Sequence, residues 1–328
     1  MSTCLAESGP TPQYWRQFDA LVRVCPFEAS RRRLSNGSDA YFYQAGPRDA
    51  PRIVLVSPAE SPFLLFSRVG RELARTHRVM AWDNSTAAFM EAPFSVPPPT
   101  LQRMAEDLLC LIEAEAGDDV HVVSWCSGAL IALWTMDLAP GVISSASFIA
   151  PPSVLGLAPD RTDFQSRFLH MILELASGTH PDEASLCRQI LEVPRERPIL
   201  DEVDQAIADL TRQPVRNEIA LRRYAKSIQN ACLTLPPGRT QSGHRAYVDI
   251  VAERCGAVPM ALLHCRDDDV VSYKCSADVA ARNDNVRFVM YPRGGHFVIY
   301  KEPEMLSADI ASFVAHVRRP RREGGTES

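Results

Sequence analysis

Apolar and polar positions along the chain predict strands and helices in alternation from residue 51 onward. Short continuous apolar runs, which are typical of strands buried on both faces, are separated by segments with helical spacing. We predict strands at residues 52–56, 78–83, 120–125, 142–149, 259–264 and 285–291, and helices that include 66–76, 100–115 and 303–317. This alternation favours an α/β protein with a mostly parallel, doubly wound sheet covered by helices on both faces.

Two regions depart from the alternation. Residues 1–50 show less pattern, and we expect them to supply early strands and a helix of the core, with residues 41–43 in a strand and residues 31–33 in a solvated loop. Between residues 152 and 241 the apolar spacing is helical throughout, which predicts a helical cap inserted between two strands. The predicted core is therefore residues 51–151 with 242–317, and residues 318–328 are predicted to be a disordered tail.

The most informative stretch is VHVVSWCSGALIALW, residues 120–134. A β-branched apolar run stops abruptly and a helix-forming run begins, which predicts a strand, a sharp turn and a helix with Cys126 at the turn. Such a turn presents a nucleophile when the residues two positions to either side are small, as Ser124 and Gly128 are. The N-terminus of the following helix favours a thiolate. Ser127 fits less well as the nucleophile, because the bulky Trp125 stands two residues before it.

Composition and charge narrow the class of protein. Of the 328 residues, 46% are hydrophobic and 23% are charged, and the net charge of −5 argues against a general nucleic-acid-binding protein. The chain shows no secretory signal pattern and no apolar run of the ~18 residues that a membrane-spanning helix needs. The nine cysteines form no CxxC pair and no zinc-ligand spacing. We therefore expect a cytoplasmic protein with reduced cysteines and no metal site.

Two further loops carry candidate chemistry. The predicted strand at 259–264 leads into the acid loop within LLHCRDDDVV, and the strand at 285–291 is followed by GGHFVIYKEPE, which contains His296. Open α/β sheets place their sites at the C-terminal ends of parallel strands, where both loops and Cys126 are predicted to lie. A nucleophile, an acid and a histidine follow one another in this chain order in one large group of enzymes.

On these motifs, the chain from about residue 51 to 317 resembles the α/β-hydrolase-fold enzymes with a helical cap. The family pattern in the acid loop is a glycine, two residues, an aspartate and an apolar pair. Cys265 occupies the glycine position, so the resemblance implies that Asp268 is the acid that orients His296, the general base. Asp267 and Asp269 are then its neighbours in the loop.

The same resemblance implies an oxyanion hole, a pair of N–H groups that stabilises the tetrahedral intermediate. The backbone N–H of Ser127, next to Cys126, is one expected donor, and the N–H of Ala59 is the other. Family enzymes usually carry His-Gly in the second position, whereas this chain carries Ser57 and Pro58. Pro58 has no N–H, which is why the prediction moves to Ala59.

A cysteine in place of the usual serine changes the energetics of acyl transfer. Attack of a thiolate on an oxygen ester makes a higher-energy thioester, whereas attack on a thioester replaces one thioester by another. Cys126 therefore suits acyl groups carried on phosphopantetheine, either of a carrier protein or of coenzyme A. Similar cysteine enzymes move acyl or aminoacyl groups between carrier proteins in nonribosomal peptide and polyketide pathways. We expect an acyl- or aminoacyltransferase with a thiol, an amine or a hydroxyl as the final acceptor.

Three other functions stay open: a cysteine-type thioesterase or cyclase, a small-molecule esterase or lactonase, and a non-catalytic binding protein on this scaffold. Apart from the phosphopantetheine arm of the donor, which is the substrate carrier, we expect no bound cofactor, and neither nucleic acid nor membrane as a partner. For an acidic carrier protein, the predicted helix near 214–232 offers basic contacts: Arg216, Arg222, Arg223 and Lys226. A solvated helix face is the alternative interpretation of these charges.

Overall fold

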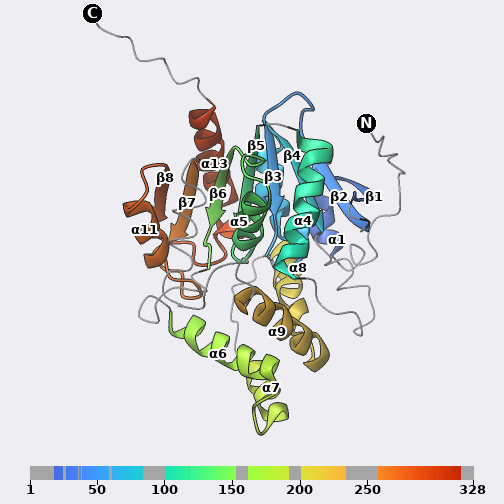
Figure 1. Ribbon diagram of the computed structural model, residues 1–328, viewed down its shortest axis with the longest axis vertical. Coiled ribbons are helices and arrows are strands. Elements are labelled where there is room, and N and C mark those ends of the chain that lie inside the picture. Colours follow the sequence, from blue (N-terminus) through green and yellow to red (C-terminus); the bar gives the residue numbers. More distant parts are fainter. Residues whose placement is uncertain are drawn as a thin grey trace, which may run out of the picture.

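The computed structural model describes residues 18–24, 27–35, 37, 39–58, 61–83, 100–117, 119–152, 162–191, 201–233 and 258–318. Within these ranges the strands form one sheet in the order β1-β2-β4-β3-β5-β6-β7-β8 (Figure 1). The strands are β1 (Glu28–Arg33), β2 (Asp39–Ala45), β3 (Arg52–Val56), β4 (Arg78–Asp83), β5 (Val120–Trp125), β6 (Ser145–Ile149), β7 (Met260–Cys265) and β8 (Val286–Tyr291). From β3 to β8 all neighbours pair in parallel, and β1 and β2 add an antiparallel edge. The predicted α/β fold with a mostly parallel sheet is confirmed.

The continuous apolar runs of the sequence become strands that are covered on both faces. Every residue of β5, β6 and β7 is buried. Large side chains such as Trp82 on β4 and Phe148 on β6 are at most 1% exposed. Burying a side chain of this kind stabilises the fold by about 1.5–3 kcal/mol, so the sheet is the most strongly stabilised part of the molecule.

Helices cover the two faces of the sheet. One face packs against α4 (Leu101–Leu111), α5 (Gly128–Leu138) and α11 (Lys274–Ala281). The other packs against α1 (Asp19–Val24), the short turn η2 (Phe63–Phe66), α2 (Ser67–Leu73), α12 (Val298–Lys301) and α13 (Pro303–Val317). Helix α4 begins where the sequence predicts, because the Thr100 side chain accepts a hydrogen bond from the N–H of Arg103 at 3.1 Å. A π-helical turn (Ile112–Ala116) follows it.

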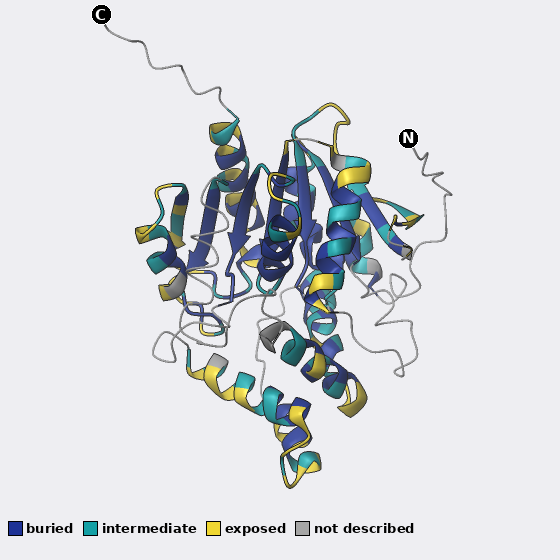
Figure 2. Ribbon diagram, viewed as in Figure 1, coloured by how far each residue is buried: buried dark blue, intermediate teal, exposed yellow. Residues whose placement is uncertain are grey.

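Between β6 and β7 the structure has four helices in its described residues, and they lie beyond the C-terminal ends of the parallel strands (Figure 1). They are α6 (Asp163–Ser177), α7 (Glu183–Leu191), α8 (Glu202–Arg212) and α9 (Glu218–Leu233), with the turn η5 (Gln213–Val215) between the last two. Helix α8 packs its buried Ile207 and Leu210 into the apolar core of the sheet. Helices α6, α7 and α9 instead form an apolar cluster of their own. Figure 2 shows these outer helices with much more exposed surface than the strands.

Some predictions fail or fall outside the described ranges. Residues 31–33, predicted as a solvated loop, lie in β1, where Arg32 pairs with Glu115 and covers the Phe42 ring at 4.9 Å. Residues 153–161, 192–200 and 234–257 of the predicted cap region and its end, and residues 319–328 of the predicted tail, lie outside the described residues. Among the helices that the structure describes, none is long and apolar enough to span a membrane.

Candidate active site

The turn between β5 and α5 presents Cys126. Strand β5 ends at Trp125 and α5 begins at Gly128, so the chain reverses its course over two residues. Cys126 has a φ of 49°, in the left-handed region that costs a non-glycine residue about 1–3 kcal/mol. Its N–H donates to the carbonyl of Ile149 at 2.9 Å, which ties the turn to the end of β6. The strained turn predicted from the sequence is therefore present, with the cysteine at its apex.

Gly128 shows why the turn requires a small residue two positions after Cys126. A Cβ atom at Gly128 would lie 2.4 Å from the carbonyl oxygen of Val56 and 2.8 Å from that of Ser57. Both distances are shorter than any real contact, so the start of α5 can approach the end of β3 only with glycine here. On the other side, Ser124 is fully buried within the sheet.

The acid loop and the histidine loop meet beside this turn. The Nδ1 atom of His296 lies 3.0 Å from Oδ2 of Asp268, and Cys126 lies near enough to raise the pKa of His296. Only 6% of the His296 side chain and none of the Asp268 side chain is exposed. The structure thus brings together the three residues that the sequence predicts as a triad.

Asp268 is held by its own loop as well as by the histidine. Its Oδ1 atom accepts the N–H groups of Val270 at 2.9 Å and Val271 at 2.8 Å, while Oδ2 faces His296. Burial, the largest single influence, raises the pKa of Asp268, but the charge and hydrogen bond of His296 and the Val271 N–H outweigh it and lower the pKa. The carboxylate therefore stays ionised against the imidazole.

The histidine is correspondingly easy to protonate. Burial is again the largest single influence and lowers the pKa of His296, but the charges of Asp268 and Cys126 and the hydrogen bonds to both raise it to about 10. An imidazolium that is held by a carboxylate can donate a proton to a group beside it. The arrangement can therefore supply a nucleophilic sulfur atom and a proton donor on the same side of the turn.

Two residues that the sequence interpretation missed also contact the histidine loop. The indole N–H of Trp125 donates to the backbone carbonyl of His296 at 3.0 Å, and the two rings pack with centroids 5.2 Å apart. The carboxylate of Asp267 accepts the backbone N–H groups of Gly294 and Gly295. Neither contact could be predicted from residue spacing, because each involves a backbone group of a distant residue. The separation is 171 residues for Trp125 and 28 residues for Asp267.

The predicted oxyanion hole can be placed only in part. Ser127 stands at the N-terminal cap position of α5, directly after Cys126, as the prediction requires. Ala59 lies outside the described residues. Before it, Ser57 is buried at the end of β3, and its carbonyl lies close to Gly128. The Ser127 and Ala59 N–H groups stay predicted donors.

Two further histidines lie in buried hydrogen-bond networks away from this triad. His121 on β5 contacts the hydroxyl groups of Ser145 at 2.8 Å and Ser147 at 3.0 Å on β6. His264 on β7 contacts the Ser276 hydroxyl on α11 at 2.9 Å. Burial lowers the pKa of His121 to about 3 and that of His264 to about 4, so both rings stay neutral. Within the described ranges, no three His, Cys, Asp or Glu side chains gather as metal ligands do.

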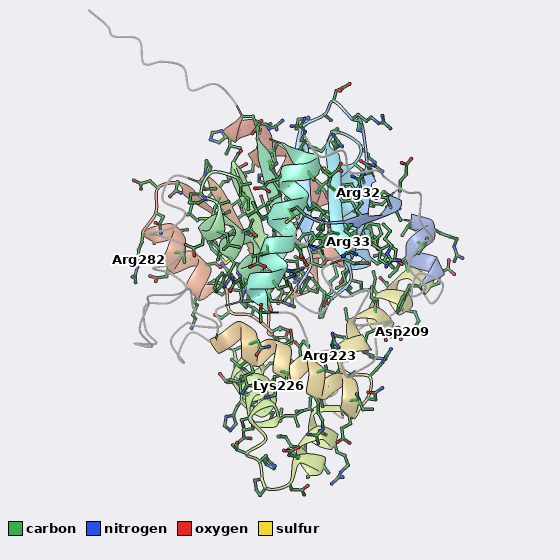
Figure 3. The ribbon with its side chains drawn as sticks, turned by 45° about the vertical axis from the view of Figure 1, so that its right-hand side comes forward. Arg32, Arg33, Asp209, Arg223, Lys226 and Arg282 are labelled. Atoms are coloured by element: carbon green, nitrogen blue, oxygen red, sulfur yellow. The ribbon has the colours of Figure 1, made fainter. Side chains whose placement is uncertain are left out.

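The predicted carrier-contact residues do not form one exposed face. Arg223, labelled in Figure 3, is buried, with 7% of its surface exposed, on the helix α9 that packs against α6 and α7. Arg222 lies between Glu183 of α7 and Glu218 of its own helix, so its charge is already paired. Arg216 and Lys226 are exposed, and they hydrogen-bond Gln213 and Gln229. Arg223 therefore has little surface that a partner could reach, and contact of these four residues with a carrier protein stays a prediction.

A cysteine on a strand-turn-helix elbow, an aspartate and a histidine meet at the C-terminal ends of parallel strands, which is where hydrolase-type folds place their active sites. The profile of the alpha/beta hydrolase family matches residues 53–308, and the chain belongs to this family. A Mycobacterium tuberculosis protein named "Putative non-heme bromoperoxidase BpoC" is 24% identical over 253 residues, which span 75% of this chain and 86% of that protein.

Solved structures show the same fold. The crystal structure of BpoC superposes with a TM-score of 0.56 at 23% identity, covering 84% of this chain and 96% of that one. Carboxylesterase CesB of Bacillus subtilis gives a TM-score of 0.60 at 12% identity, covering 93% and 98%. A hydrolase of Oleispira antarctica gives 0.61 at 12% identity, covering 84% and 94%. At these identities the likeness establishes the fold and leaves the substrate open.

Proposed function

We propose that the protein is an acyl- or aminoacyltransferase that takes an acyl group from a phosphopantetheinyl thioester onto Cys126 and passes it to an acceptor. One observation carries the proposal: a cysteine occupies the strained turn, near a histidine that is held by Asp268 and whose pKa is raised to about 10. A thiolate paired with an imidazolium is a strong nucleophile toward thioesters at neutral pH.

The first half of the reaction moves the acyl group to the enzyme. The Cys126 sulfur attacks the carbonyl carbon of the donor thioester, and the resulting oxyanion is stabilised by the N–H of Ser127 and a second donor. The bond between this carbon and the donor sulfur then breaks, and His296 gives its proton to the departing pantetheine thiol. An acyl thioester on Cys126 and a neutral His296, still oriented by Asp268, remain.

In the second half of the reaction His296 accepts a proton instead of donating one. An acceptor thiol, amine or hydroxyl loses its proton to His296 as it attacks the acyl carbon, and the bond to the Cys126 sulfur breaks. Because a thioester replaces a thioester, transfer to a second carrier thiol is nearly balanced in energy. The helices α6 to α9 lie over this edge of the sheet, and Thr162, just before α6, donates to the Val270 carbonyl in the acid loop at 3.0 Å. We infer that these helices limit the access of water to the acyl group.

Hydrolysis of small oxygen esters is the second candidate, because solved structures of this fold include the carboxylesterase CesB. For that reaction the Cys126 sulfur has to form a less stable thioester from an ester, which opposes acylation. The two candidates therefore differ in donor preference. A transferase acylates Cys126 from thioesters far faster than from oxygen esters of the same acyl group, whereas an esterase turns over oxygen esters rapidly.

The experiment is intact-protein mass spectrometry after incubation with matched donors. Acyl-loaded carrier proteins, acyl-CoA thioesters and methyl esters of the same acids are compared. We expect one acyl mass increment from at least one thioester donor, absent in Cys126→Ala. Ser127→Ala keeps most of the acylation, because its backbone N–H remains. Full acylation of the Cys126→Ala protein, or multiple turnover of esters without a thioester preference, contradicts the proposal.

A further inference from the structure

Adjacent aspartates in the acid loop contact opposite ends of the histidine segment. Asp268 faces the His296 ring. Asp267, one residue earlier, accepts the N–H of Gly295 with Oδ1 at 2.8 Å and the N–H of Gly294 with Oδ2 at 3.3 Å. Each carboxylate thus joins the loop after β7 to the loop after β8, one through a ring and one through the backbone.

The glycine loop needs such an anchor. Gly294 has a φ of +134° and Gly295 a φ of +63°, both positions where glycine is favoured. Glycines have the largest conformational freedom in the absence of fixed contacts, and these two directly precede His296. A Cβ at Gly294 would lie 2.8 Å from the Cys265 sulfur, so this backbone is packed tightly against the first residue of the acid loop's motif.

We propose that Asp267 is a positioning residue, whose carboxylate fixes the backbone before His296 so that the ring reaches Cys126 and Asp268 together. The inference rests on the proposed role of His296 in acyl transfer. Trp125 completes the arrangement, because its indole N–H holds the His296 carbonyl on the other side. The N–H groups of Gly294 and Gly295 before the histidine and the carbonyl of His296 after its Cα are then bound, which restrains the backbone on both sides of His296.

The acid loop offers a matched control in Asp269. It is exposed, two residues along the same loop, and accepts no hydrogen bond from a described residue. Removing either carboxylate changes the net charge of the loop equally. A difference between Asp267→Ala and Asp269→Ala therefore reports the contacts to the glycine N–H groups. Asp267→Asn removes the charge but keeps one acceptor oxygen, so it is expected to fall between Asp267→Ala and the native protein.

The test measures the reactivity of Cys126 toward iodoacetamide as a function of pH, followed at the Cys126 peptide by mass spectrometry. In this reaction the thiolate sulfur forms a bond to the methylene carbon and iodide leaves, so no acyl substrate is required. The charged or titratable groups around the reacting pair are Asp268 and Asp267 in the acid loop, Cys265 and His264 on β7, and Lys301 on α12. Their contributions are common to all variants except at the mutated position.

We expect Asp267→Ala to slow alkylation near pH 6.5 by about tenfold, less than the ~100-fold that a 1 Å misplacement can cost. Its pH profile should shift toward that of a free thiol, because a mobile ring pairs less often with the sulfur. Asp267→Asn should lose less alkylation rate than Asp267→Ala. Asp269→Ala should stay within about twofold of the native rate, because substitution of an exposed residue usually has a small effect. Circular dichroism and thermal melts verify that all three are folded.

Two results distinguish failure of the positioning role of Asp267 from failure of the proposed function. Equal rates and equal pH profiles for Asp267→Ala and Asp269→Ala overturn the positioning role. If the native protein accepts no acyl group from any thioester, the proposed function fails, but the alkylation profiles still test Asp267. With acyl donors, a positioning role predicts a lower rate constant for acylation with little change in donor concentration at half-saturation.

Discussion

The loops around Cys126 and the outer cap helices both carry charged side chains, but the two regions hold them differently. Asp268 is fully buried and bonded to His296 and to two backbone N–H groups. In the cap, Arg222 is 40% exposed and pairs with glutamates that are 32% and 53% exposed. Exposed pairs contribute about 0–1 kcal/mol and are weakened by salt, whereas breaking a buried pair costs about 3–5 kcal/mol. Around Cys126 the buried charges bear on the chemistry of the site. In the outer helices the exposed ion pairs contribute little to the stability of the fold.

The largest expected effect is that of Asp268→Asn. The carbonyl oxygen of the introduced amide can still accept from Val270 and Val271, but the amide nitrogen then faces Nδ1 of His296 and selects the wrong tautomer. We expect the acylation rate to fall by about 10⁴, as in a serine triad that loses its acid. Rapid-quench mass spectrometry of the acyl-enzyme provides the measurement. A loss smaller than tenfold, or a larger loss in Asp269→Asn, would show that the acid is elsewhere in the loop.

Gly128→Ala tests whether the backbone itself enforces the turn. The added methyl group would lie 2.4 Å from the Val56 carbonyl oxygen, so α5 must move away from β3. Overpacking of this kind costs about 1–3 kcal/mol, and the movement takes Cys126 away from His296. We expect a lower midpoint in urea unfolding together with loss of acylation. Gly141→Ala is the comparison, because its φ is +90° but no atom lies within 4 Å of its Cβ, and acylation should persist there. Equal acylation in both variants contradicts the account.

The pH dependence of stability separates the structural histidines from the site histidine. The folded-state pKa of His121 is about 3, below its unfolded value of 6.5, so below pH 6.5 the unfolded chain binds a proton that the folded chain does not. Stability is therefore lost as the pH falls from 6.5 toward 3, by about 1.4 kcal/mol per unit from this group. His296 has the opposite sign: its raised pKa contributes stability below pH 6.5 that is lost as the pH rises toward 10.

Urea unfolding of the native protein and of His121→Gln, from pH 7.5 to pH 5, measures this dependence. The variant should lose less stability over that interval, whatever its stability at pH 7.5. Parallel curves for the two proteins would mean that His121 takes up a proton in the folded state.

The smallest effect is expected from the exposed basic residues of the cap. Arg216 and Lys226 remain candidates for contact with an acidic carrier after the burial of Arg223 is taken into account. The double variant Arg216→Glu with Lys226→Glu should raise the carrier concentration at half-saturation a few-fold at low salt and less at high salt. Arg282→Glu on α11, which Figure 3 shows away from the cap, is the matched control. If both variants change the carrier concentration at half-saturation equally at all salt concentrations, the cap is not part of the carrier-binding surface.

Much of the core could be predicted because its signals are local. The apolar runs match β3, β4, β7 and β8 within one residue, since strands buried on both faces need continuous apolar sequence. The turn at Cys126 could be found because its steric requirement falls on Ser124 and Gly128, two fixed positions in the sequence. Asp268 follows from its spacing in the acid loop, and the structure places it against His296.

The remaining features depend on contacts between distant segments. Strand β1 contains three consecutive arginines, and it forms because it pairs with β2 at the edge of the sheet, where polar side chains are tolerated. The burial of Arg223 follows from packing on both sides of α9, which helical periodicity alone does not reveal. Asp267 contacts backbone N–H groups in another loop. Because such groups are not specific to a residue type, no sequence pattern predicts the contact.

The lifetime of the acyl-enzyme is the most direct test of whether the protein transfers acyl groups. Native protein acylated on Cys126 is freed of donor, and the acyl mass increment is followed with time, with and without a phosphopantetheinylated acceptor carrier. The account predicts slow loss in buffer alone and rapid discharge when the carrier thiol is added, with the acyl group recovered on the carrier. Rapid loss to water at a rate that no acceptor changes would contradict acyl transfer and make the protein a thioesterase.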